Sequence, residues 1–188
     1  MRIIGGKFKG KKILEPKDKE TRPLKDLTKE SIFNIINHSN KFSINLEDSC
    51  VLDLFSGTGS FGLECLSRKA KHVTFVENYK NILPVLKKNL LNLKSVKNYK
   101  IIQKDILNKL DITIFKEKFD IIFLDPPYKM NDLEKLLNSI LNIKLIKNDG
   151  ILIIHRFKKK KDKFPNSFKI IEEKVYGISK IIFGTYSQ

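Results

Sequence analysis

Carboxylates stand at the ends of four successive apolar stretches of this chain, at Asp53, Glu77, Asp105 and Asp125. Near-continuous apolar stretches are typical of buried parallel strands. The carboxyl ends of parallel strands meet at one edge of a sheet, where open α/β folds bind their ligands. One acid at a strand end is a weak signal, but four in register favour a shared site. The sequence therefore predicts a ligand site built from these four acids.

The segment after Asp53 indicates what kind of ligand binds there. It runs Phe55-Ser56-Gly57-Thr58-Gly59 and leads into a helix. Glycines at 57 and 59 allow positive φ angles and close approach of a ligand, while the N–H groups of the helix end face outward. A nucleotide-like ligand is expected over this loop, and a glycine-rich turn without a ligand is the plainer alternative.

The same glycines also fit a second class of protein. With Gly62 they match G-x-G-x-x-G, and Glu77 follows Gly57 by 20 residues, which is the dinucleotide fingerprint of an NAD-dependent oxidoreductase. Two features oppose this reading. Asp53 stands where such folds place an apolar residue, and Asp125-Pro126-Pro127-Tyr128 has no role in hydride chemistry.

Alternating apolar patterns give the elements that position these residues. Strands are predicted over 50–55, 72–77, 99–104, 119–124 and 150–155, with a closing antiparallel pair over 168–175 and 179–186. Helices are predicted over 24–38, 60–68, 79–93 and 131–146, with a shorter one over 105–110. This order predicts an α/β fold with a mostly parallel, seven-stranded sheet and helices on both faces. Residues 1–20 are expected to form a basic β-hairpin extension, and residues 21–188 the main domain.

Composition limits the partners. The chain has 188 residues and a formal charge of +16, which favours nucleic acid, although a general lysine-rich bias would give a similar excess. Its two cysteines have no metal-site spacing, and no signal peptide or membrane-length apolar run is visible. A cytoplasmic monomer without a metal site is expected.

Taken in order along the whole chain, the motifs resemble the RsmD-type family of class I S-adenosylmethionine-dependent methyltransferases. This family methylates the N2 amine of a guanine in 16S ribosomal RNA. The resemblance implies a Rossmann-like fold, S-adenosyl-L-methionine as cofactor, and 16S rRNA or a partly assembled small subunit as partner. The residues that carry it are Arg2-Ile3-Ile4-Gly5-Gly6, Arg22-Pro23, Glu30-Ser31-Ile32-Phe33-Asn34, Asp53 to Gly59, Glu77, Asp125-Pro126-Pro127-Tyr128 and Glu173-Lys174-Val175-Tyr176-Gly177.

The resemblance also assigns the cofactor residues. Asp53 is expected near the methionine amino group and Glu77 on both ribose hydroxyls, because both groups donate hydrogen bonds to carboxylates. Asp105 is expected to accept from the adenine amine. The remaining cofactor contacts implied are Phe55, Ser56, Gly57, Thr58, Gly59, Asn78 and Ile106.

Asp125-Pro126-Pro127-Tyr128 is the expected catalytic element. An exocyclic guanine amine is a poor nucleophile, because its lone pair is delocalised into the ring. The Asp125 carboxylate and the Pro126 carbonyl can accept its two hydrogens, and the two prolines fix the direction of that carbonyl in advance. Tyr128 offers a ring on which the base can stack.

The target base has to leave its stack, so the RNA backbone beside it needs a grip. The candidates are basic residues of the hairpin, the residue before Pro23 and one strand-end histidine: Arg2, Lys7, Lys9, Lys11, Lys12, Arg22 and His155. His155 occupies a region where the family carries an acid, and an ordinary strand-end histidine is an equal alternative. DNA adenine-N6 or cytosine-N4 methylation and a non-catalytic assembly factor remain alternative functions.

Overall fold

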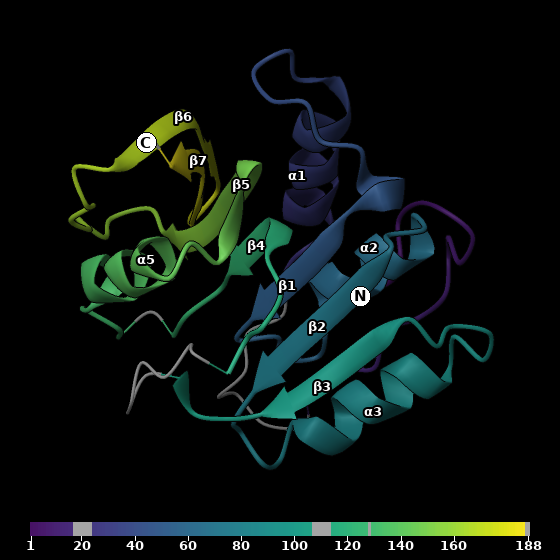
Figure 1. Ribbon diagram of the computed structural model, residues 1–188. Helices are drawn as coiled ribbons and strands as arrows, with labels where there is room; N and C mark the ends of the chain where they lie inside the picture. Colours follow the sequence, from purple (N-terminus) through teal and green to yellow (C-terminus); the bar gives the residue numbers. More distant parts are fainter. Residues whose placement is uncertain (17–23, 107–113, 128, 187–188) are drawn as a thin grey trace.

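The fold is a seven-stranded sheet with helices on both faces, as the sequence predicts. Figure 1 shows the computed structural model, which describes residues 1–16, 24–106, 114–127 and 129–186. The strand order is β3-β2-β1-β4-β5-β7-β6. The strands are β1 (Cys50–Leu54), β2 (His72–Glu77), β3 (Tyr99–Gln103), β4 (Phe119–Leu124), β5 (Ile146–Phe157), β6 (Phe168–Tyr176) and β7 (Ser179–Tyr186). The first five run parallel, and β7 is antiparallel to both β5 and β6.

Two apolar layers cover the sheet because successive strand residues point to opposite faces. The described helices are α1 (Asp26–His38), α2 (Ser60–Ser67), α3 (Leu83–Leu91) and α5 (Leu133–Asn142), with a short 3-10 turn at Leu46–Asp48. Side chains of α1, α2 and α3 share one core with Val51, Phe75 and Phe123. Side chains of α5 share the other with Leu52, Ile122 and others. None of the helices in the described residues is long and apolar enough to cross a membrane.

The order of strands determines where the acids lie. Strand β1 pairs with β2 on one side and with β4 on the other, so the chain reverses its direction of growth between β1 and β4. At such a switch point the two flanking loops diverge and leave a crevice at the carboxyl ends of the strands. Asp53, Glu77 and Asp125 all lie at or just beyond these ends, which confirms their predicted convergence on one edge.

Some element boundaries differ from the sequence prediction. The predicted helix over 131–146 ends at Asn142, and β5 begins at Ile146, four residues early. Lys144 takes a left-handed φ of 53° just after the helix ends, and the pairing of β5 with β4 shifts register after Phe119. Helix α3 is also shorter than predicted. The predicted short helix over 105–110 falls mostly outside the described residues.

The N-terminal segment pairs as a minimal hairpin packed on the domain. Arg2 and Lys12 form a β-bridge, and Ile3 and Ile13, each 1% exposed, belong to the core shared with α1 and α2. At its tip the backbone lies against the end of α2, where Lys7 N–H donates to the Ser67 carbonyl at 2.7 Å.

The close approach of the hairpin tip to α2 explains why residue 6 is a glycine. A Cβ on Gly6 would lie 2.0 Å from the Ser67 carbonyl oxygen, and its φ is +72°. Gly10 has a similar φ of +86° but nothing within 4 Å of its Cβ position. Gly10→Ala therefore measures the left-handed conformation alone, at about 1–2 kcal/mol, and Gly6→Ala adds the clash.

We expect Gly6→Ala to lose about 1–3 kcal/mol more unfolding free energy than Gly10→Ala, because overpacking adds a cost of this size. Urea unfolding followed by circular dichroism would measure both. Equal losses would show that the hairpin tip does not need its close contact with α2.

Candidate functional site

Asp53 is a buried carboxylate held by the start of α2. It is 1% exposed, and its Oδ2 accepts the Gly62 N–H at 3.0 Å. Burial raises the pKa of Asp53 well above its usual range, the Gly62 hydrogen bond opposes this, and the nearby charges of Asp125 and Glu77 add to the increase. A cation placed beside this group would relieve its desolvation and favour its ionised form.

The loop after β1 has the strained backbone that its glycines suggested. Gly57 and Gly59 have φ of 54° and 81°, and Phe55 is also left-handed, at 63°. Ser56 closes the turn, since its Oγ donates to the Asp53 carbonyl at 2.7 Å. A Cβ on Gly59 would lie 2.5 Å from the Leu86 side chain. At Gly59, the positive φ that the sequence suggested and the packing against Leu86 of α3 both require glycine.

Glu77 ends β2 and closes over the same loop. Its Oε2 accepts the Gly57 N–H at 2.7 Å, while its Oε1 accepts the Asn78 and Tyr79 N–H groups at 2.9 and 2.8 Å. A carboxylate oxygen has about two acceptor positions, so Oε1 is filled by the backbone and Oε2 keeps one position. The structure thus brings Asn78 and Gly57 to Glu77, as the predicted site requires.

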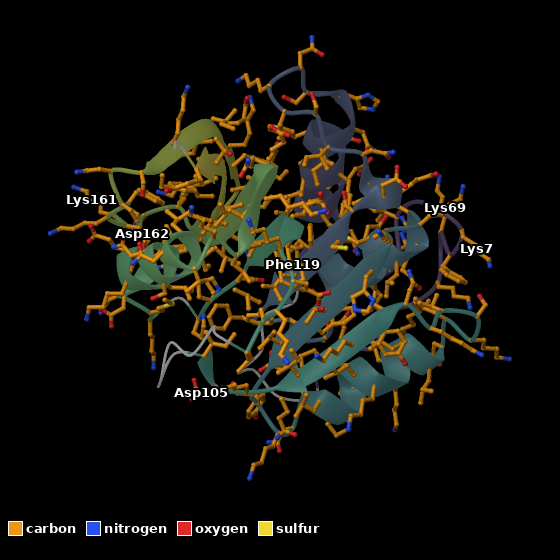
Figure 2. All side chains as sticks on the ribbon, in the orientation of Figure 1. Lys7, Lys69, Asp105, Phe119, Lys161 and Asp162 are labelled. Carbon is orange, nitrogen blue, oxygen red and sulfur yellow. The ribbon has the colours of Figure 1, made fainter. Side chains whose placement is uncertain are left out.

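Asp105 and Ile106 follow β3 at the same edge of the sheet. Ile106 is buried in the core on the α5 side, and Asp105 is half-buried. Figure 2 labels Asp105 on the side of the molecule where the arrows of β2 and β3 end in Figure 1.

Asp125 is oriented by His155, a contact that sequence analysis did not foresee. The Asp125 Oδ1 lies 2.8 Å from His155 Nδ1, and His155 Nε2 lies 2.9 Å from Ser179 Oγ. Burial of the ring lowers the pKa of His155, but the Asp125 charge and hydrogen bond outweigh it and raise that pKa above 6.5. Because His155 is 6% exposed and uses both ring nitrogens, its surroundings favour support of Asp125 over contact with RNA.

The described residues between β4 and α5, 125–127 and 129–131, are here called the β4–α5 turn, and a second unforeseen residue holds them. Arg156 is fully buried and donates to the carbonyl oxygens of Met130 at 2.8 Å and Pro127 at 3.5 Å. It also binds both carboxylate oxygens of Asp162, at 2.6 and 2.9 Å. A sequence signal was present: Asp162 is the one acid in a run of lysines, six residues after the arginine. Tyr128 lies outside the described residues.

The tip of the hairpin lies away from the acidic edge, whereas its base approaches the start of α2, because Lys29 Nζ donates to both the Arg2 carbonyl and Ser60 Oγ. Arg2, Lys7, Lys9, Lys11 and Lys12 are exposed, but the tip with Lys7 contacts the last turn of α2, about 12 Å along that helix from the Gly57 loop. Figure 2 shows Lys7 on the opposite side of the view from Asp105. Arg22 lies outside the described residues.

Two other observations concern a pocket away from the acids and the possibility of a metal site. A pocket lined by Asn45, Asp120 and Lys147 lies at the opposite edge, where the strands begin, and contains none of the four predicted acids. Within the described residues no group of His, Cys, Asp or Glu side chains could hold a metal ion.

The raised pKa of His155 gives a testable pH dependence. A raised folded-state pKa contributes stability that is fully present below about pH 6.5 and is lost as pH rises through the folded-state value, at about 1.4 kcal/mol per unit of increase. We expect the stability advantage of the wild type over His155→Gln to shrink between pH 5.5 and 9. Exposed His38→Gln is the control. Parallel urea-unfolding profiles for wild type and His155→Gln would refute the pairing with Asp125.

Comparison with known proteins agrees with these motifs. A family model described as conserved hypothetical protein 95 matches residues 1–185. Ribosomal RNA small subunit methyltransferase D of Haemophilus influenzae is 34% identical, over 95% of this chain and 90% of that protein. The relative of the same name in Buchnera aphidicola is 33% identical, over 92% and 86%. A putative methyltransferase structure from Escherichia coli superposes with a TM-score of 0.81 at 27% identity, over 100% and 99% of the two chains. The chain therefore belongs to the conserved hypothetical protein 95 family, the family of the RsmD-type methyltransferases that its motifs resemble.

Proposed function

We propose that this protein transfers a methyl group from S-adenosylmethionine to the N2 amine of a guanine in 16S ribosomal RNA, during assembly of the small subunit. One observation carries the proposal: the Asp125-Pro126-Pro127 turn lies beside the buried Asp53 and Glu77 at the switch point of the sheet, with Asp125 oriented by His155. The names of the relatives support rRNA as the substrate.

The residues at the strand ends fit the cofactor. When bound, it supplies an electrophilic methyl group on a sulfonium cation. Asp53 suits its α-amino cation, because a positive neighbour would offset the burial that raises the pKa of this carboxylate. Glu77 Oε2 suits a ribose hydroxyl, and its Oε1 serves to anchor the backbone. Asp105 and Ile106 are assigned to the adenine.

Asp125 and Pro126 are assigned to the target amine. With Oδ1 held by His155, the second carboxylate oxygen and the Pro126 carbonyl accept the two amine hydrogens, which draws the nitrogen toward tetrahedral geometry. The nitrogen lone pair would then form the bond to the methyl carbon as the carbon–sulfur bond breaks, and the bonding electrons would leave with the sulfur as a neutral thioether. The resulting ammonium loses one proton, for which Asp125 is the nearest acceptor in this arrangement. Fixed orientation of the reacting atoms supplies most of the acceleration.

The function is tested by supplying methyl-labelled cofactor with unmodified small-subunit particles, naked 16S rRNA or DNA, then identifying the labelled nucleoside. N2-methylguanosine from the RNA or the particles is the expected product. Label in DNA alone would replace the proposal with a DNA amino-methyltransferase. Cofactor binding without label in any acceptor would favour a non-catalytic assembly factor.

The roles of Asp125 and Glu77 separate in two variants. Asp125→Ala is expected to reduce transfer by at least about a hundredfold with little change in cofactor affinity. Glu77→Ala is expected to weaken cofactor binding first, since it removes an acceptor and three backbone hydrogen bonds. Calorimetry of cofactor binding, combined with single-turnover rates, measures both. Equal loss of cofactor affinity in the two variants would contradict this division.

Asp53→Asn is expected to raise the stability of the fold and to weaken cofactor binding. Because the pKa of Asp53 is raised in the folded state, ionisation destabilises the fold as pH rises above the unfolded value of about 3.9. We expect Asp53→Asn to melt above wild type at pH 7.5 without cofactor, and to gain less from added cofactor.

Thermal melting at pH 5.5 and 7.5, with and without S-adenosylmethionine, would show both effects. Asp149→Asn, at an exposed position, is the matched control. A variant that melts below wild type and still gains the full stabilisation by cofactor would show that Asp53 has neither role.

A further inference from the structure

A lysine-rich loop follows β5 at the carboxyl edge of the sheet. Residues 158–163, here called the lysine loop, contain five lysines and Asp162. Lys158, Lys159, Lys161 and Lys163 are exposed. Because β5 runs parallel to β4, this loop leaves the sheet at the same edge as the β4–α5 turn. Figure 2 shows Lys161 and Asp162 on the opposite side of the view from Lys7 and Lys69.

The backbone of the lysine loop is held by β7 and the preceding turn. Lys158 N–H donates to the Ile178 carbonyl at 2.8 Å, and Lys160 N–H donates to the Phe157 carbonyl at 2.9 Å. Lys180 Nζ donates to the Lys160 carbonyl at 3.1 Å. The backbone of the loop is therefore anchored at Lys158 and Lys160.

Side chains join this loop to the β4–α5 turn in two places. Lys160 Nζ donates to Asn131 Oδ1 on the surface. Beneath it, the buried Arg156 guanidinium holds the Asp162 carboxylate on one side and the Met130 and Pro127 carbonyls on the other. Arg156 and Asp162 side chains are 0% and 1% exposed, so water does not compete for these bonds.

The planar guanidinium suits this role because it offers five donors in a fixed geometry. It uses them on two segments that are about thirty residues apart in the chain. Movement of one segment relative to the other would leave either a charge or a carbonyl unpaired in the interior, which is costly. The pair therefore fixes the distance from the lysine loop to Pro127.

We propose that the lysine loop binds the phosphate backbone of the substrate RNA beside the target base, and that the buried Arg156–Asp162 pair positions this contact relative to Asp125-Pro126-Pro127. The inference rests on the proposed function in taking RNA as the partner. It adds a contact surface to that of the N-terminal hairpin, whose tip lies at the far end of α2.

Charge complementarity favours phosphates as the occupant. Four exposed ammonium groups within six residues present a compact positive surface, and Asp162 is turned inward to Arg156 and does not neutralise it from outside. Lysine binds phosphate as a point charge and needs no sequence-specific geometry. A contact of this kind holds the backbone while the β4–α5 turn receives the flipped base.

The first test compares two variants that lose the same charge at opposite edges. Lys158→Gln/Lys159→Gln/Lys161→Gln/Lys163→Gln is the loop variant. Lys69→Gln/Lys71→Gln/Lys97→Gln/Lys118→Gln is the control, since these exposed lysines precede β2, β3 and β4. Both reduce the formal charge from +16 by four, to +12. Binding to unmodified 16S rRNA transcript is measured by fluorescence anisotropy over a range of salt concentrations, without cofactor.

The loop variant is expected to bind RNA at least about tenfold more weakly, with a log–log salt slope reduced by about 3, since each phosphate contact contributes about 0.7–0.9. The control is expected to change Kd by less than about threefold, because salt screens charges beyond about 10 Å. Equal weakening of both variants would overturn the proposal. Because this readout needs no methyl transfer, an inactive wild type would refute the proposed function without deciding the binding result.

The second test separates positioning from stability. Asp162→Asn alone leaves the Arg156 charge buried without its partner, so a lower melting temperature is expected. Arg156→Met/Asp162→Leu replaces the pair by apolar side chains and is expected to melt closer to wild type, since such exchanges are often neutral. Its single-turnover methylation rate is expected to fall at least about tenfold, with cofactor affinity unchanged.

A wild-type transfer rate in the folded double variant would overturn the positioning role. Lys160→Gln/Asn131→Ala breaks the surface contact without touching the buried pair, and it keeps the question testable if the double variant does not fold. It is expected to lower the single-turnover rate by a smaller factor than the Arg156→Met/Asp162→Leu variant. An unchanged rate in Lys160→Gln/Asn131→Ala would contradict a role of the lysine loop in placing the base.

Discussion

The site depends on keeping three carboxylates close together at a partly dry edge of the sheet. Burial, together with the neighbouring charges of Asp125 and Glu77, raises the pKa of Asp53 well above its usual range. Backbone N–H groups stabilise these carboxylates: Gly62 donates to Asp53, while Gly57 and Asn78 donate to Glu77. These donors are available because the chain turns directly from a strand end into a loop or helix start, where N–H groups have no partner within the element. To point these N–H groups at the carboxylates, the Gly57 loop adopts left-handed backbone conformations.

The end of β5 supports the β4–α5 turn from both faces of the sheet. His155 and Arg156 are consecutive, so their side chains leave the strand in opposite directions. His155 fixes the Asp125 carboxylate, and Arg156 fixes the carbonyls of Pro127 and Met130. Pre-set hydrogen-bonding groups of this kind matter for a weak amine nucleophile, because the acceptors are aimed before the base arrives. One strand thus controls both the side chain and the backbone of the proposed catalytic element.

Residues 2–6, which form the first motif of the family resemblance, have a structural role that is independent of any RNA contact. Lys29, fully buried, donates to the Arg2 carbonyl at 2.6 Å and lies 3.9 Å from the buried Glu64. Glu64 in turn accepts the Ile4 N–H at 2.8 Å. Burial lowers the pKa of Lys29, against the attraction of Glu64. These contacts join the hairpin, α1 and α2, and the close approach at Gly6 completes the seam. These residues are therefore needed for the packing of the hairpin on α1 and α2.

The sequence by itself determined the order of strands and helices, the strand-end acids and the glycine turn, because these follow from local apolar periodicity and from residues with special φ angles. It could not determine where β5 begins, since a left-handed Lys144 and a register shift depend on the neighbouring strand. Nor could it pair His155 with Asp125, or Arg156 with Asp162, because burial and distance between segments arise only when the sheet brings separate strand ends together. The charge of the lysines is visible in the sequence, but only the tertiary structure decided that Lys7 lies away from the acidic edge and that the lysine loop lies at it, through the directions of α2 and β5.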